Sequence, residues 1–172
     1  DLSRTVGWFT SIFPVHINLE AALDPGTALK IVKEELRSIP NRGIGYGVLR
    51  YLSRDRQITE SLNSTSKAEV LFNYLGQFDQ TFSQSSSFKF ARESSGLALS
   101  QHGQRSHLLE INALITNSKL RVNWAYSKNI HRQTTVKFIA EKFKEVLCEL
   151  IAHCLSPEAG GYTPSDFPDV ML

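Results

Sequence analysis

The sequence predicts an α/β fold, in which flanking helices pack on a mixed β-sheet. Runs rich in β-branched and aromatic residues alternate along the chain with segments whose apolar residues recur at the 3.6-residue period of a helix. Two runs near the middle, separated by Asn117-Ser118-Lys119, form the clearest hairpin pattern. With 172 residues, 41% of them hydrophobic and 21% charged, the chain is long enough to bury a core.

The strand pattern predicts five strands, near residues 6–10, 15–19, 69–75, 108–116 and 120–126. Pro14 divides the first pair, because proline cannot donate to a β-ladder. In the last strand, Leu120, Val122, Trp124 and Tyr126 alternate with smaller or polar residues, which predicts one buried face.

The helical pattern predicts two main helices, near residues 26–38 and 131–155. Asp24 and Pro25 have the residue types expected at the start of the first helix. The apolar residues of the second helix line one face, and Gly160-Gly161 follow it. Residues 48–52 are expected to be helical as well, whereas residues 54–67 are polar and predict a surface connection.

Composition excludes several classes of function. A net charge of +2 without a basic, aromatic-rich block argues against nucleic-acid binding, and no run of 18 apolar residues predicts a membrane span. Cys148 and Cys154 have neither zinc nor redox spacing, so we expect no metal site and a reduced, cytoplasmic protein. The chain begins at Asp1 without Met, which suggests a piece of a longer polypeptide.

Asn73 interrupts the apolar run from Val70 to Leu75, which predicts a short buried strand. Burying a primary amide without a hydrogen-bonding partner costs about 1–3 kcal/mol. Such a residue either satisfies nearby polar groups of the protein or holds a ligand, and the residue pattern leaves both alternatives open.

Three segments of the chain resemble motifs of the epimerization domains of nonribosomal peptide synthetases, which are relatives of the condensation domains. Arg4–Val15, RTVGWFTSIFPV, resembles the family's RTVGWFTxxYPV, with Phe13 in place of the usual Tyr. Pro40–Gly47 matches PxxGxGYG, and Phe72–Asp79 matches FNYLGQFD. The three motifs occur in the family's order and span much of the chain, so the resemblance implies the C-terminal half of a chloramphenicol-acetyltransferase-like fold.

The resemblance also implies a domain organisation. Residues 1–158 correspond to the C-terminal lobe of an epimerization domain, and residues 159–172 to a linker toward a following domain. The two prolines and the lack of periodicity in residues 162–168 predict that this linker is extended. The family's HHxxxDG and EGHGRE motifs, which supply its acid/base residues, do not occur in these 172 residues. We therefore expect the N-terminal lobe of the same domain and neighbouring synthetase domains as partners, and little activity from this stretch alone.

The implied reaction is inversion from L to D at the α-carbon of an aminoacyl or peptidyl thioester. The substrate is carried on the phosphopantetheine of a peptidyl carrier protein, and no cofactor is expected on this lobe itself. By resemblance, Asn73 and Tyr74 support catalysis, Asn73 as a donor to the enolate oxygen. Gly43, Gly45 and Tyr46 are the candidate substrate-binding residues, although a turn shaped by the glycines beside the cleft and packing of Tyr46 explain them better.

A non-catalytic alternative is a lobe that serves only as a spacer or as a docking surface for the carrier protein. Four arginines, Arg4, Arg37, Arg42 and Arg50, suit an acidic carrier domain or its phosphate, but scattered arginines are also typical of a solvated face.

Overall fold

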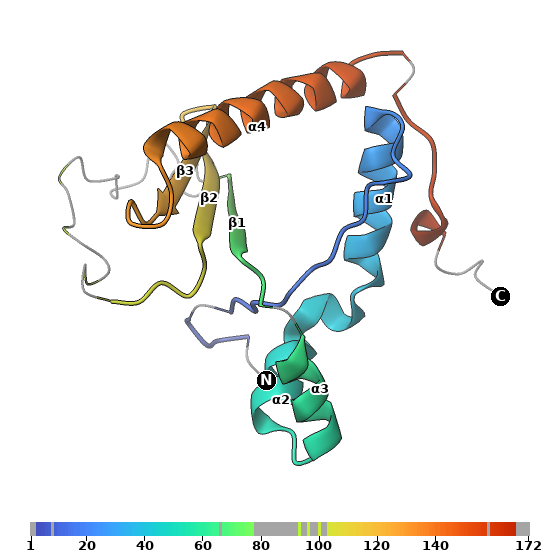
Figure 1. The fold of residues 1–172 in the computed structure, drawn as a ribbon. Coiled ribbons are helices and arrows are strands. Elements are labelled where there is room, and N and C mark those ends of the chain that lie inside the picture. The colour runs from blue at the N-terminus through green and yellow to red at the C-terminus, as the bar shows by residue number, and fades with distance from the viewer. Residues whose placement is uncertain are drawn as a thin grey trace. The chain divides into compact units, whose positions relative to one another are not determined.

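The computed structural model describes residues 3–7, 9–65, 67–77, 93, 96, 100, 103–157 and 159–167. The chain separates into two compact units, one made of residues 67–143 and the other of residues 1–66 together with 144–172. Figure 1 gives the order of the elements along the chain.

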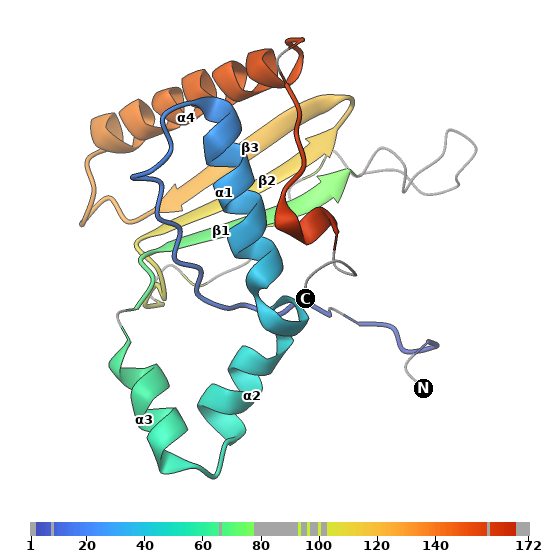
Figure 2. The same cartoon turned by 90° about the vertical axis from the view of Figure 1, so that its right-hand side faces the viewer.

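A three-stranded mixed sheet forms the centre of the first unit. Its strands are β1 (Val70–Gln77), β2 (Leu109–Thr116) and β3 (Lys119–Tyr126), in the order β1-β2-β3. Strands β1 and β2 run parallel, and β3 returns antiparallel to β2 (Figure 2). Three of the predicted strands and the predicted hairpin are thus confirmed. Asn117 and Ser118 both have positive φ, as a tight hairpin turn requires.

One face of this sheet is covered by the beginning of the long helix α4 (Gln133–Cys154), which confirms the helix predicted near 131–155. The rings of Trp124 and Phe143 meet edge to face, with centroids 5.8 Å apart. Ile111 and Ala113 on the central strand and Val136 on the helix are the buried apolar residues among those described. The core of this unit therefore lies between α4 and the strands β2 and β3.

The other unit contains the remaining helices. The predicted first helix is α1 (Pro25–Ser38), capped by Asp24, whose carboxylate accepts from the Thr27 backbone N–H at 2.9 Å. After the short 3₁₀ turn η1 (Pro40–Gly43), α2 spans Ile44–Leu52 and contains the helical residues predicted near 48–52.

A third helix, α3 (Arg56–Ser64), lies where the sequence predicts a polar surface connection, so that prediction is wrong. Asp55 caps it by accepting from the Gln57 N–H at 2.8 Å. Ile58 and Leu62 are four residues apart and form one stripe along the helix. A cap and a single apolar stripe are sufficient for a helix that packs on α2.

The strands predicted near 6–10 and 15–19 are not found, because the described residues in these ranges form neither a helix nor a strand. Phe9 is 69% exposed rather than in a core, while Trp8 lies outside the described residues. β-Propensity expresses how well a side chain suits a pleated sheet with neighbours. The described residues of this unit contain no strand with which these apolar residues could pair.

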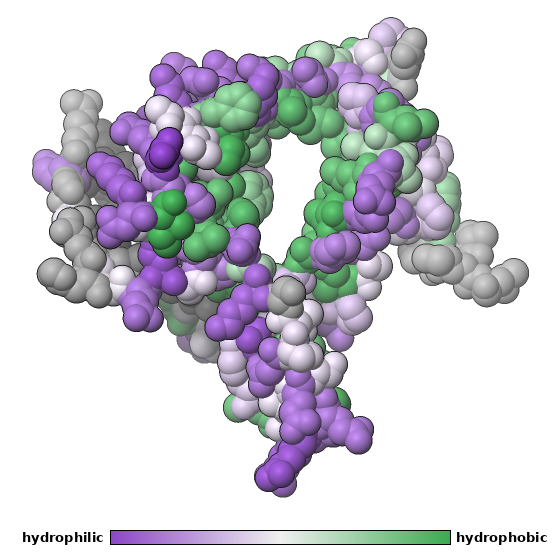
Figure 3. Space-filling model, viewed as in Figure 1, coloured by the Kyte–Doolittle hydropathy of each residue, from purple (hydrophilic) through white to green (hydrophobic). Residues whose placement is uncertain are grey.

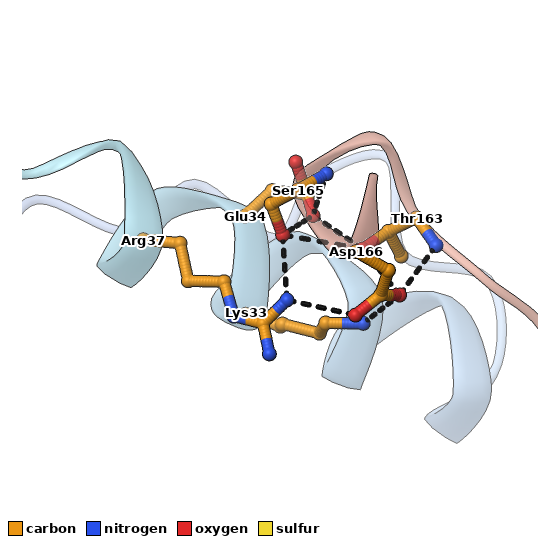
Figure 4. A network of polar contacts seen from close by, with 6 residues as sticks. All are labelled: Lys33, Glu34, Arg37, Thr163, Ser165 and Asp166. Atoms are coloured by element: carbon orange, nitrogen blue, oxygen red, sulfur yellow. Dashed lines mark hydrogen bonds and ion pairs between the residues drawn. The ribbon is translucent and has the colours of Figure 1, made fainter. Parts of the chain in front are cut away.

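The segment predicted as an extended linker instead folds against α1. Thr163–Asp166 form a capping box around the 3₁₀ turn η2 (Pro164–Asp166). Figure 4 shows how this turn bonds to α1. We call the six residues involved the C-terminal clamp: Lys33, Glu34, Arg37, Thr163, Ser165 and Asp166.

Charge-assisted hydrogen bonds hold the clamp together. Asp166 forms ion pairs with Lys33 and with Arg37, the latter at 2.8 Å. Glu34 accepts from the hydroxyls of Thr163 and Ser165. The expectation of an extended conformation is therefore wrong at residues 163–166, whereas a following domain remains a prediction.

The clamp predicts an acid-sensitive contribution to stability. The hydrogen bond from Lys33 and the Thr163 backbone N–H lower the pKa of Asp166, and the Ser165 and Thr163 hydroxyls lower that of Glu34. A carboxyl whose pKa is lower in the folded protein than in the unfolded chain stabilises the fold above the unfolded value. We expect this contribution to be lost as the pH falls below about 4.

Urea unfolding of the complete domain between pH 7 and pH 3 measures this effect. The Asp166→Asn variant should be less stable at pH 7 and should lose less stability on acidification than the wild type. A parallel loss in both proteins would contradict the role of Asp166. The matched control is Asp55→Asn, which alters a cap away from the clamp.

Candidate functional site

Strand β1, which carries most of the FNYLGQFD motif, lies at an edge of the described sheet, because it pairs only with β2. Val70, Phe72 and Tyr74 are 50–56% exposed, so the prediction of a buried strand is wrong. Helix α4 covers the sheet over β2 and β3, while the same face of β1 remains open. Apolar side chains also reach the surface over the strands and over α1 in the space-filling view (Figure 3).

Asn73 has a side-chain partner on the neighbouring strand. It lies beside Asn112 in the parallel register, and its Nδ2 donates to the Asn112 Oδ1 at 3.2 Å. Both side chains are partly buried. This bond satisfies one of the two N–H groups of the Asn73 carboxamide, which supports a structural role. The described residues supply no partner for the second N–H, which can donate to another group.

The strand is irregular immediately beyond this residue. The register with β2 shifts between Tyr74 and Gln77, and Gly76 has φ +85° within the shifted stretch. Glycine adopts such a φ without the steric cost that a Cβ brings. The Gly in the FNYLG motif thus has a local structural reason, since it permits the irregularity after Tyr74, beyond which β1 pairs with β2 again at Gln77.

Asn73 and Tyr74 lie on opposite faces of β1, because side chains alternate along a strand. Tyr74 pairs with Ala113, which is buried on the face that α4 covers, whereas Asn73 bonds to Asn112 on the other face. The structure therefore does not bring these two predicted catalytic residues together on one face.

Gly43, Gly45 and Tyr46 belong to the other unit. Gly43 is buried, with φ +76°, and a Cβ placed there would lie 2.0 Å from Cδ1 of Phe13. Gly45 lies inside helix α2, with nothing within 4 Å of an added Cβ. The close approach of Phe13 explains why Gly43 must be glycine, and substrate binding by Gly43, Gly45 and Tyr46 remains a prediction.

Tyr46 takes part in a cation–aromatic cluster on α2. Arg50 donates to its hydroxyl, and the guanidinium lies 5.8 Å from the ring centroid of Tyr46 and 5.5 Å from that of Tyr51. This packing engages Arg50, and the clamp engages Arg37. Two of the four arginines considered for carrier docking therefore have partners within the chain.

Sequence reasoning missed Asn112 and Asn123, which continue the row begun by Asn73. Asn112 pairs with Asn123 on β3, on the face away from α4. The hairpin pattern contained a signal for this second pair, because a turn at 117–118 places residues 112 and 123 opposite each other. No such signal exists for Asn73 and Asn112, whose strands are parallel and far apart in sequence.

The described part of the chain shows no grouping of three or more His, Cys, Asp or Glu side chains with the proximity that a metal ion needs. None of the helices described there combines the length and apolar character needed to cross a bilayer. Cys148 and Cys154 are both free thiols on exposed residues.

Comparison with known proteins decides the family. The family model described as the condensation domain matches residues 1–172, the whole chain. This chain belongs to the condensation domain family. The mixed sheet with flanking helices is accordingly the fold of a condensation-type domain of nonribosomal peptide synthetases.

Relatives of this condensation-family chain are long synthetases. It is 51% identical over 168 residues to a linear gramicidin synthase of Brevibacillus parabrevis, covering 98% of this chain and 2% of the relative. It is 43% identical to bacitracin synthase 3 of Bacillus licheniformis, covering 98% and 3%, respectively. The chain thus spans only a few per cent of the length of these relatives.

A solved structure similar to this condensation-family chain is the epimerization domain from the third module of tyrocidine synthetase B. The TM-score is 0.78 at 37% sequence identity, covering 90% of this chain and 34% of the solved one. The expected α/β fold, with its likeness to one part of an epimerization domain, is confirmed.

Proposed function

We propose that this chain is part of an epimerization domain that inverts the α-carbon of an aminoacyl or peptidyl thioester carried by a carrier protein. The observation that carries this proposal is the likeness to a solved epimerization domain, 37% identical over 90% of the chain. The FNYLGQFD match adds support, because the described residues supply a partner for only one of the two amide N–H groups of Asn73, at the edge of the described sheet.

The chemistry consists of two proton transfers. A base removes the α-proton, the electron pair moves into the thioester carbonyl to form an enolate, and a proton returns to the opposite face of the α-carbon. A thioester α-proton is weakly acidic, so the developing oxyanion needs a preorganised donor. We assign that donor role to Asn73 and the proton transfers to groups beyond residues 1–172. The carrier protein and the adjoining synthetase domains are the proposed partners.

Tyr74 cannot act on the same carbonyl as Asn73 from its observed position, since it lies on the other face of β1. The residue is 50% exposed, and its hydroxyl remains a candidate for contact with the rest of the domain. Of the two predicted catalytic residues, the geometry favours Asn73.

The test uses the complete domain with a carrier protein loaded with an L-aminoacyl group, in deuterated water. We expect solvent deuterium at the α-carbon and a mixture of L and D residues after thioester cleavage, measured by mass spectrometry and chiral chromatography. Residues 1–172 alone should give neither. Peptide-bond formation without exchange at the α-carbon would contradict epimerization. The absence of both activities would favour a docking or spacer role.

A further inference from the structure

The side-chain row across the sheet indicates a second residue that acts on the same site. Asn73, Asn112 and Asn123 occupy register positions next to one another on β1, β2 and β3. We propose that Asn112 is a positioning residue, which fixes the direction in which the Asn73 carboxamide faces. This inference rests on the proposed function and concerns its geometry.

A carboxamide needs such a partner because its two ends have nearly the same shape. Rotation by half a turn exchanges the oxygen and the NH₂ group, and only hydrogen bonds distinguish the two states. In the structure, the Asn73 NH₂ faces the Asn112 Oδ1 at 3.2 Å. Rotation of Asn73 alone would replace this hydrogen bond by two oxygens facing each other, and the opposite hydrogen bond would require Asn112 to rotate as well. Asn112 therefore holds one N–H and leaves the other in a defined direction for an acceptor.

The location of Asn112 suits this task. It lies on the central strand, which is hydrogen-bonded on both sides, and its chain neighbours Ile111 and Ala113 are 7% and 3% exposed. Asn73 lies on the edge strand, close to the register shift at Gly76. Asn112 on the central strand β2 thus orients the donor Asn73 on the edge strand β1. Active-site geometry generally depends on such supporting residues.

Charge near the row is compensated. Glu110 precedes Asn112 by two residues, so it lies on the same face of β2. It pairs with Arg105 at 3.2 Å, and Arg105 also donates to the Ala125 carbonyl oxygen at 3.1 Å. Two neutral amides on this face consequently lie beside a neutralised pair, which suits a site where negative charge develops only during reaction.

The alternative is an ordinary cross-strand pair that contributes only to stability. In that case, removing the acceptor would lower the stability of the domain but leave the rate per folded molecule unchanged. Positioning predicts a change in rate that depends on the presence of Asn73. The two interpretations therefore differ in a double-mutant cycle.

The experiment uses the complete domain and its loaded carrier protein, with inversion measured in both directions. Asn112→Leu keeps the approximate shape but removes the acceptor, and we expect roughly tenfold or greater slowing, comparable to the loss of a supporting partner at a metal site. Both directions should slow equally, with an unchanged final L:D ratio and an unchanged KM for the carrier. Asn112→Gln retains an amide oxygen and should recover part of the rate. Asn123→Leu, one strand further from Asn73, is the matched control.

The decisive comparison is Asn73→Ala with and without Asn112→Leu. If Asn112 acts through Asn73, the double variant should be no slower than Asn73→Ala alone. The inference would be overturned if the rate losses of the two single variants multiplied in the double variant. A wild-type rate per folded molecule for Asn112→Leu would also overturn it, even if Asn73 is essential. A wild-type rate for Asn73→Ala would instead overturn the proposed site itself. Should Asn112→Leu not fold, Asn112→Ala supplies the same comparison.

Discussion

Replacing Asn73 with alanine in the complete domain should slow inversion by about 10²–10³-fold, because one preorganised donor to an oxyanion is lost. The stability cost should be small by comparison, since the bond to Asn112 lies at a partly buried edge position. The measurement is the initial rate of α-deuteration per folded molecule, with thermal unfolding of the same samples.

Asn73→Asp provides a second and sharper variant. It keeps the shape of the side chain but replaces the NH₂ group by oxygen, which faces the acceptor Oδ1 of Asn112 and offers negative charge to the enolate. Asp should therefore be at least as damaging as Ala. A normal rate for Asn73→Ala would refute the donor role and leave Tyr74 as the candidate on this strand.

Replacing Gly43 with alanine should destabilise the domain by about 2–5 kcal/mol, the sum of overpacking and of left-handed backbone strain. The added Cβ would lie 2.0–2.4 Å from three ring carbons of Phe13, at a residue whose φ is +76°. Gly43 is buried and Phe13 is partly buried, so relief of this clash requires the backbone or the ring to shift. The urea-unfolding midpoint of the complete domain reports the loss.

The same helix offers a matched control. An added Cβ at Gly47 has nothing within 4 Å, and Gly47 lies within α2. Gly47→Ala should leave stability unchanged or raise it by about 0.5–1 kcal/mol. Phe13→Leu should relieve part of the defect of Gly43→Ala, because a smaller side chain can yield. Equal unfolding of Gly43→Ala and the wild type would show that Phe13 does not pack there.

The sequence alone determined the helices and the hairpin whose caps, turns and apolar patterns come from residues close together in the chain. Asp24 and Pro25 marked the start of α1, and the turn at Asn117-Ser118 marked the hairpin and thereby its antiparallel register. The long apolar stripe of α4 was equally clear. Each of these depends on contacts between residues close in the chain, so pattern and propensity are sufficient.

The sequence predicted strands wrongly where residues of high β-propensity had no strand to pair with. Residues 6–19 are rich in Val, Ile and Phe, but side chains such as Phe9 remain exposed and no described strand pairs with them. The polar residues 54–67 concealed α3, whose cap and two-residue stripe are weaker signals than overall polarity. Propensity describes a preference, and pairing or packing decides whether it is realised.

Only the tertiary structure decided the arrangement of the candidate site. The motif named Asn73 and Tyr74 together, but strand alternation places them on opposite faces. The partner of Asn73 is Asn112, 39 residues away, because a parallel register between distant strands is set by the packing of the whole sheet. The TPSD segment looked like a linker for the same reason. Its partners Lys33, Glu34 and Arg37 lie more than 120 residues earlier in the chain. No local sequence pattern predicts contacts between residues so far apart.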